Sequence, residues 1–134
     1  MGSGRVVGSD ERWLATLDGL DAVRARAFAA GDDRMLRSVY ASADLAATDA
    51  ALLHRLVPGG CGLRGVRTRY RPIAFDSRGD RATLVVTATL GASQLVCGAQ
   101  VRATLPGAGP TRLRIVVVRA GSGWRIAQQR VDGG

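Results

Sequence analysis

The order of the periodic patterns along the chain limits the folds that this protein can adopt. Apolar residues recur at helical spacing through the first half, and from Leu63 onward they alternate with polar residues as in strands. Helices that precede an unbroken run of strands are typical of an α+β fold, in which they cover one face of an antiparallel sheet. We therefore predict an α+β domain in which three N-terminal helices cover a curved antiparallel sheet of four to six strands.

The three predicted helices have recognisable ends. The first is expected to begin at a cap on Asp10 and to end at Gly31, because glycine readily adopts the left-handed conformation that closes a helix. A short second helix is expected after a cap at Asp32 or Asp33, and a third over residues 48–56, before Pro58-Gly59-Gly60.

The second half contains strand patterns that turns separate. Arg67, Arg69 and Arg71 alternate with less polar residues, so one face of the first strand is expected to be arginine-rich and exposed. Further strands are expected over residues 81–90, 95–105, 112–119 and 124–131, with turns at 77–80 and 120–123 and a loop at 106–110. The residues expected in the core are Trp13, Leu17, Phe28, Tyr40, Leu84, Val86, Ile115, Val117 and Ile126.

Composition restricts the class of protein and of partner. The 134 residues suffice for one domain, and no stretch approaches the roughly 20 apolar residues that a membrane helix needs. All 19 basic residues are arginine, as in proteins from GC-rich genomes, and the net charge of +8 favours anionic partners such as phospholipid surfaces. Two Trp, two Tyr and two Phe residues are too few for the aromatic stacking of nucleic-acid readers, so we do not expect a nucleic-acid partner.

The two cysteines are placed to face each other across a hairpin. If the strands on either side of the turn at 77–80 extend far enough, Cys61 lies opposite Cys97. We predict a disulfide between them, which places the domain outside the cytoplasm. The alternatives are two reduced thiols in the core, or a second turn at Gly91 that pairs Cys97 with Ala88 instead.

Four segments together resemble the nuclear transport factor 2-like superfamily. They are WLATLDGLDAVRARAF at 13–28, GDDRMLRSVYA at 31–41, DAALLHRL at 49–56 and GSGWRI at 121–126. Within that superfamily the chain looks like the actinobacterial, polyketide-cyclase-like domains of unknown function. The resemblance implies a cone-shaped, cystatin-like roll, in which a bent sheet and the helices enclose a ligand-binding pocket. Residues 1–4 (Met-Gly-Ser-Gly) are typical of an expression scar, so residues 5–134 are expected to form a single domain of this superfamily.

The enzymes of this superfamily use titratable groups inside the cone, and the resemblance transfers none of them to this chain. Isomerase-like sites use a strand carboxylate, and epoxide-hydrolase-like sites use two acids bridged by an arginine. The predicted strands contain almost no carboxylate. Asp21 and Arg24 lie three residues apart on the first helix, so we expect an ion pair that keeps Asp21 ionised. We therefore expect no catalytic residue and no turnover of ketones, epoxides or polyketides.

The single histidine, His54, is expected to be a partly exposed structural residue, because no carboxylate at a suitable spacing orients it. One histidine and two distant cysteines do not make a metal site, and no nucleotide-binding motif follows the glycines at 59–62. We therefore predict neither a metal nor a cofactor.

Six residues are candidates for the lining of the pocket. They are Trp13, Leu17, Tyr40, Trp124, Gln128 and Arg130. Gln128 and Arg130 share the Trp124 face of the last predicted strand, and an arginine there suits an anionic group on a ligand. The alternatives are core packing for the aromatic residues and an exposed position beyond the helices for Gln128 and Arg130.

Two functions from different classes fit these observations. The first is a noncatalytic binding or accessory domain, the extracytoplasmic part of an anchored or secreted protein. It binds a partner protein or a small apolar or anionic ligand in the cone. The alternative is a small cytoplasmic enzyme, polyketide-cyclase-like or isomerase-like, that acts on an apolar substrate. The shortage of acids on the predicted strands favours the binding domain.

Overall fold

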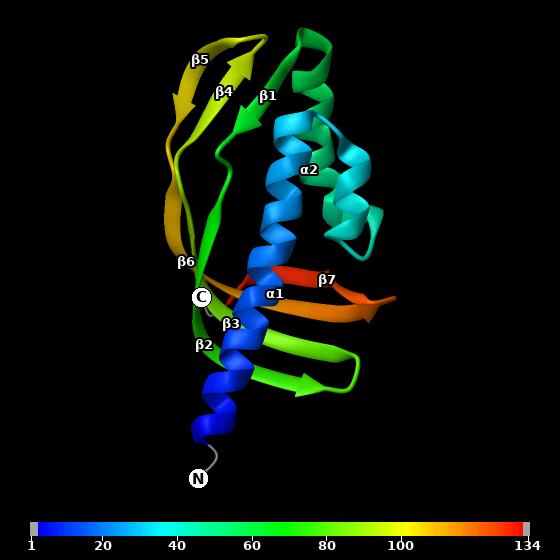
Figure 1. Cartoon of the computed structure of the whole chain (residues 1–134), viewed down its shortest axis with the longest axis vertical. Helices are drawn as coiled ribbons and strands as arrows, with labels where there is room; N and C mark the ends of the chain where they lie inside the picture. The colour runs from blue at the N-terminus through cyan, green and yellow to red at the C-terminus, as the bar shows by residue number, and fades with distance from the viewer. Residues whose placement is uncertain (1–2, 133–134) are drawn as a thin grey trace.

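The computed structural model describes residues 3–132, and the side chains of residues 11–132 (Figure 1). Within this range the helices are α1 (Ser3–Ala30), the 3-10 helix η1 (Asp33–Ser38), α2 (Ala43–Leu56) and the 3-10 helix η2 (Val57–Gly59). The strands follow as β1 (Cys61–Arg64), β2 (Thr68–Arg78), β3 (Arg81–Leu90), β4 (Ser93–Cys97), β5 (Gln100–Leu105), β6 (Ala108–Ala120) and β7 (Gly123–Val131). The predicted α+β class, with helices before strands, is confirmed.

The helices differ from the prediction at their starts. α1 is already helical at Ser3, so Asp10 lies within it and does not cap it; the Asp10 side chain is outside the described part. Asp32 caps η1, as one of the two predicted alternatives requires. α2 begins well before residue 48, because Ser42 accepts a backbone N–H and caps the helix there.

The sheet region contains more strands than the four to six that were predicted. Seven strands lie within the described residues. The predicted strand over 95–105 is a hairpin of β4 and β5 that turns at Gly98 and Ala99. The loop predicted at 106–110 is shorter than expected, since β6 already begins at Ala108. The chain bends at this point and continues as a strand.

Three long antiparallel segments bend at the same level and divide the strands into two sheets, β1-β4-β5 and β2-β3-β6-β7. β1 and β2 form one segment, β3 and β4 the second, and β5 and β6 the third. Across the bend, the N–H of Gly91 donates to the carbonyl oxygen of Arg67 at 2.9 Å. Gly107 lies so close to Leu90 that a Cβ would overlap the Leu90 carbonyl oxygen. Glycine at this level therefore permits the strong curvature that the sequence predicts.

The helices cover one side of the bent sheet, and α1 runs along both halves of it (Figure 1). One core lies between α1 and the larger sheet, and a second lies between α1, η1, α2 and β1. The residues predicted for the core are all buried except Tyr40, which is partly buried. Trp124 and Leu113 pack against the first core, so their predicted strand faces are correct.

The segment after η1 is attached to β7 by two backbone hydrogen bonds. The N–H of Ala41 donates to the carbonyl oxygen of Ile126 at 2.7 Å, and the N–H of Ile126 donates to the carbonyl oxygen of Val39 at 2.8 Å. The two bonds hold Tyr40 against the sheet, from a segment that lies far from β7 in the sequence.

Candidate functional site

A cavity of about 460 Å³, here called the central cavity, lies between the helices and the larger sheet. Its lining comes from α1, the end of η1, α2, and strands β2, β3, β6 and β7. The lining residues are Leu20, Asp21, Arg24, Val39, Tyr40, Leu45, Thr48, Asp49, Thr68, Tyr70, Ala88, Leu90, Ala108, Thr111, Leu113, Ile126 and Gln129. Apolar side chains combined with a few converging polar groups are typical of small-molecule sites.

The structure places the predicted lining residues differently. Tyr40 borders the central cavity, whereas Trp13 and Leu17 are completely buried in the core. Trp13 packs edge-on against Trp124, with the ring centres 4.8 Å apart. These side chains thus stabilise the core under the cavity, by contacts of the kind that aromatic pairs prefer.

A β-bulge determines which residues of β7 face the cavity. The pairing of β7 with β6 skips Ala127, so the alternation of faces shifts by one residue after Ile126. Gln129 therefore lines the central cavity, while Gln128 and Arg130 lie on the outer face and are exposed. A pattern of strict alternation cannot reveal such a bulge.

Arg24 on α1 and Asp49 on α2 form an ion pair in the wall of the central cavity. Arg24 Nε lies 2.7 Å from Asp49 Oδ2, and Nη2 lies 3.1 Å from Oδ1, so the contact is bidentate. The Tyr40 hydroxyl donates to Asp49 Oδ2 at 2.7 Å. Burial disfavours the charge of Arg24, but the hydrogen bonds that it donates to Asp49, and the Asp49 charge, outweigh this effect and raise the pKa of Arg24. Burial and the Asp49 charge likewise raise the pKa of Tyr40, which stays neutral.

Asp21 lies one turn before Arg24 on α1 and also lines the central cavity. One of its oxygens, Oδ2, accepts the N–H of Thr68 at 2.9 Å. The other, Oδ1, is buried and has no hydrogen-bond partner among the described residues. Burial raises the pKa of Asp21 despite the opposing effects of the Thr68 bond and the Arg24 charge. The predicted Asp21–Arg24 ion pair is therefore wrong, because Asp49 occupies the guanidinium.

Tyr70 on β2 contributes a phenol to the same cavity. Burial, and then the charge of Asp21, raise the pKa of Tyr70 to about 12. Its hydroxyl is thus protonated at neutral pH and can donate a hydrogen bond. Asp21 and Tyr70 together offer a buried acceptor and a donor from two different elements.

The spacing of the two buried acids along their helices contains a signal for their burial. Asp21 follows the buried Leu17 by four residues on α1, and Asp49 precedes the buried Leu53 by four on α2. Acids within an apolar stripe are rarely buried unless they are paired or functional. The spacing could have placed both inside the fold, but not named their partners, which come from other elements.

His54 lies apart from the central cavity, on the surface of α2. Its Nε2 is 2.7 Å from Asp33 Oδ2, and both side chains are well exposed. The ring thus has a carboxylate partner from η1, which the sequence did not predict, and the histidine is exposed as predicted. Within the described residues, no group of three or more His, Cys, Asp or Glu side chains is arranged to hold a metal ion.

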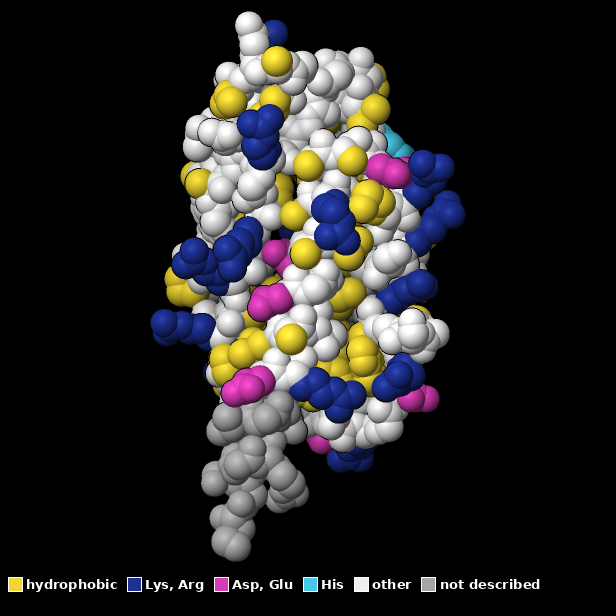
Figure 2. Space-filling view, viewed as in Figure 1, with side chains coloured by type: hydrophobic (Ala, Val, Ile, Leu, Met, Phe, Trp, Pro, Cys, Tyr) yellow, Lys and Arg dark blue, Asp and Glu magenta, His cyan; other side chains and the backbone are white. Residues whose placement is uncertain are grey.

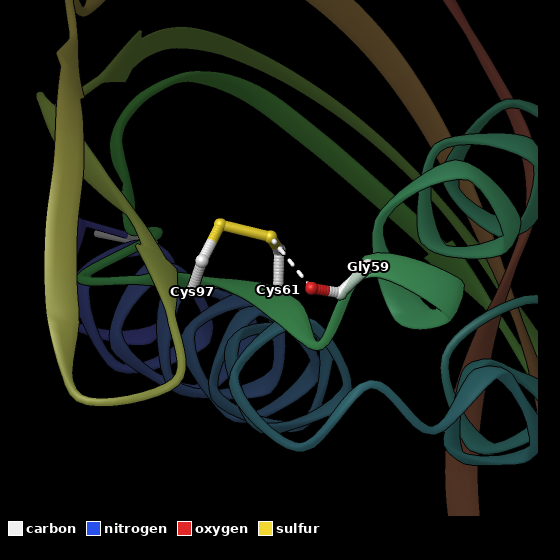
Figure 3. The surroundings of a disulfide bond; sticks show 3 residues. All are labelled: Gly59, Cys61 and Cys97. Atoms are coloured by element: carbon white, nitrogen blue, oxygen red, sulfur yellow. Dashed lines mark hydrogen bonds between the residues drawn. A yellow bond between two sulfur atoms is a disulfide. The ribbon is translucent and has the colours of Figure 1, made fainter.

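Cys61 and Cys97 form a disulfide that joins β1 to β4 (Figure 3). The two residues stand directly opposite each other, as the predicted hairpin register requires. The register continues through the bend, so the alternative turn that pairs Cys97 with Ala88 does not occur. A disulfide is typical of proteins in oxidising compartments outside the cytoplasm. None of the described helices combines the length and the apolar character of a membrane-spanning segment.

On the face that Figure 2 shows, arginine side chains are spread over most of the molecule, with acidic side chains among them. On the outer face of the larger sheet, Arg114 of β6 stands directly opposite Arg130 of β7. Asp132 binds Arg112 at 2.9 Å and Arg114 at 3.2 Å. Desolvation acts against ionisation of Asp132, but the two guanidinium groups prevail and lower its pKa. This face is therefore basic, and Asp132 neutralises part of its charge.

No family model matches this sequence, and no curated protein matches it at a significant level. A crystal structure of the intermembrane space region of the chloroplast protein ARC6 has a similar fold, with a TM-score of 0.60 and 16% sequence identity. The alignment covers 88% of this chain and 95% of that chain. At this identity the similarity concerns the fold. The resemblance to the nuclear transport factor 2-like superfamily remains a prediction.

Proposed function

We propose that this protein is a noncatalytic binding domain that holds a small, mostly apolar ligand in the central cavity. The observation that supports this most directly is the cavity itself, in which apolar side chains converge with polar and ionisable ones. Its volume of about 460 Å³ lies within the range of roughly 300–1,000 Å³ that is usual for small-molecule sites.

The proposed domain works outside the cytoplasm, as part of an anchored or secreted protein. The Cys61–Cys97 disulfide supports this location, because cytoplasmic reductants keep most thiols reduced. We also propose membership of the nuclear transport factor 2-like superfamily, since helices that cover a bent sheet around a cavity are what that resemblance implies.

A neutral fluorescent probe tests the binding function. We expect the uncharged dye N-phenylnaphthylamine to bind the native protein and to gain fluorescence in the apolar cavity. Ala88→Phe should abolish this binding, because Ala88 lines the cavity and a phenyl ring would fill it. Thr89→Phe is the matched control, since the neighbouring residue is exposed and lies on the opposite face of β3.

Two results would contradict the proposal. One is an absence of saturable dye binding to the native protein. The other is an equal loss of binding in the Ala88→Phe and Thr89→Phe variants, which would indicate a site on the surface. Capture of a protein partner by the outer face, with no effect of Ala88→Phe, would support a partner-binding domain instead.

A second candidate function, acid–base catalysis on an apolar substrate, is favoured by one observation. Asp21 is a buried titratable group in the wall of a cavity, with Arg24 and Asp49 nearby. Carboxyls with a raised pKa in such places are candidates for general acids or bases. The expectation of no turnover was based partly on an Asp21–Arg24 pair that does not form.

Assays with apolar ketones and epoxides separate the two functions. If the protein is a binding domain, no substrate is turned over above the buffer rate. A reproducible rate that Asp21→Asn abolishes and Arg69→Ala preserves would establish the enzyme instead. Arg69 is a suitable control because it is exposed and does not line the cavity.

A further inference from the structure

We propose that the ligand of the central cavity carries a hydroxyl group, which donates a hydrogen bond to Asp21 and accepts one from Tyr70. The proposal rests on the proposed binding function and adds the chemistry of the ligand's polar end. It comes from a carboxyl group that the protein itself leaves incompletely satisfied.

Asp21 is an acceptor without a full set of donors. The residue is 7% exposed, and its Oδ1 has no hydrogen-bond partner within the described part of the chain. A buried carboxylate normally accepts several hydrogen bonds, because an unsatisfied oxygen is costly in an apolar environment. Asp21 belongs to the lining of the central cavity, so a ligand held there lies beside its carboxyl group.

The nearest polar groups are already engaged with another acid. Arg24 binds Asp49 through Nε and Nη2, and the Tyr40 hydroxyl donates to the same carboxylate. If either group turned to Asp21, it would leave Asp49 buried with fewer partners. Arg24, the arginine closest to Asp21 along α1, is therefore paired with Asp49 and not with Asp21.

Tyr70 makes a hydroxyl the best match for the ligand's polar end. Its phenol lines the same cavity, and the Asp21 charge contributes to its raised pKa, so the two groups interact. An alcohol donates one hydrogen bond and accepts others, so it satisfies both side chains. An ether can accept but not donate, and an ammonium group can donate but not accept.

The remaining surface of the cavity determines the rest of the ligand. Apolar side chains that include Leu20, Ala88 and Ile126 form much of it, and Thr48, Thr111 and Gln129 add polar groups. The ligand class is therefore a compact alcohol with a mostly apolar body, aliphatic or aromatic.

Naphthol and methoxynaphthalene form a matched pair of probes. The hydroxyl group of naphthol can donate a hydrogen bond, whereas the methoxy group can only accept one. We expect the native protein to bind naphthol roughly tenfold or more tightly than methoxynaphthalene, because a hydrogen bond to a charged group usually contributes this much to affinity. Asp21→Asn should abolish most of this preference, and Tyr70→Phe should reduce it. Asp76→Asn, an exposed carboxylate on β2 that does not line the cavity, should leave the preference unchanged. Isothermal calorimetry measures all the affinities.

The outcomes separate this proposal from the function on which it rests. Equal affinity for both probes in the native protein, with both sensitive to Ala88→Phe, would overturn the hydroxyl assignment and retain the binding site. A naphthol preference that survives Asp21→Asn in a folded variant would also overturn it. Failure of both probes to bind would overturn the binding function as well.

Discussion

Arg24 forms an ion pair with one of the two acids near it, and this pairing determines which acid in the cavity wall is left without a cation. Its guanidinium binds Asp49 on α2, while Asp21, its neighbour on α1, accepts the backbone N–H of Thr68. One acid is therefore fully satisfied and structural. The other is buried, has a raised pKa and is available to a ligand.

The first prediction at the residue scale concerns Asp21 and pH. Since its pKa is higher in the folded state than in the unfolded chain, the folded state binds more protons, and stability falls as pH rises above about 4, the ordinary pKa. Asp21→Asn should thus be more stable than the native protein at about pH 7, by roughly 1.4 kcal/mol for each tenfold difference in proton affinity. The advantage should shrink as the pH falls and vanish below about pH 3, where the carboxyl is protonated in both states.

Urea denaturation of both proteins across this pH range measures the difference. The comparison isolates Asp21, because Asp18, Arg24 and Tyr70, the groups whose charges couple to it, are present in both proteins. A constant difference in stability at all pH values would contradict the raised pKa.

The second prediction at this scale concerns the Arg24–Asp49 pair. Arg24→Ala should destabilise the fold by at least about 1–3 kcal/mol, because it leaves the buried Asp49 carboxylate short of two hydrogen bonds. Arg78→Ala removes an arginine from an exposed pair with Asp76 and should change stability by less than about 0.5 kcal/mol. Thermal denaturation at neutral pH compares the two variants. Equal effects would show that the buried pair contributes no more than a surface pair.

At the scale of the elements, glycine allows the strands to bend. Gly107 lies between β5 and β6, where a Cβ would overlap the carbonyl oxygen of Leu90. Gly107→Ala should therefore destabilise the protein by about 1–3 kcal/mol, the usual range for overpacking. Gly19→Ala should stabilise it by about 0.5–1 kcal/mol, because that glycine lies within α1 with no atom near its missing Cβ. The midpoint of urea denaturation should fall for Gly107→Ala and rise for Gly19→Ala. A change in the same direction for both variants would contradict this prediction.

The disulfide connects the first strand to the fourth and closes a loop of 36 residues in sequence separation. Reduction, or replacement of both cysteines by serine, should lower stability by about 3–4 kcal/mol, because the unfolded chain gains conformational freedom. The melting temperature with and without reductant measures this effect, and reductant should not affect the double serine variant. The prediction is contradicted if reductant leaves the melting temperature of the native protein unchanged although mass spectrometry shows that the disulfide is reduced.

The hairpin shows what the sequence could predict at this scale. Turn residues at 77–80 determined the register that brings Cys61 opposite Cys97, and the register persists through the bend. The bulge at Ala127 could not be predicted, because it depends on how β7 meets β6 rather than on its own pattern. For this reason Gln128 and Arg130 were expected near the pocket, where Gln129 lies instead.

At the scale of the whole molecule, the α+β class and the core could be predicted from periodicity, and the polar site could not. Burial follows from local patterns, so Trp13, Leu84 and Ile115 were assigned correctly. The partners of Asp21 and Asp49 come from different elements, and packing decides which of two competing acids an arginine binds. The chemistry of the cavity thus depends on tertiary structure.

The central claim is that the central cavity, and not the basic outer face of the sheet, is the ligand site. Amide resonances in a ¹H–¹⁵N correlation spectrum of the protein, titrated with naphthol, test it most directly. The account predicts that the largest shifts fall on the cavity residues Asp21, Thr68 and Ile126. Shifts confined to Arg69, Arg112 and Arg130 on the outer face, with the cavity residues unchanged, would contradict it.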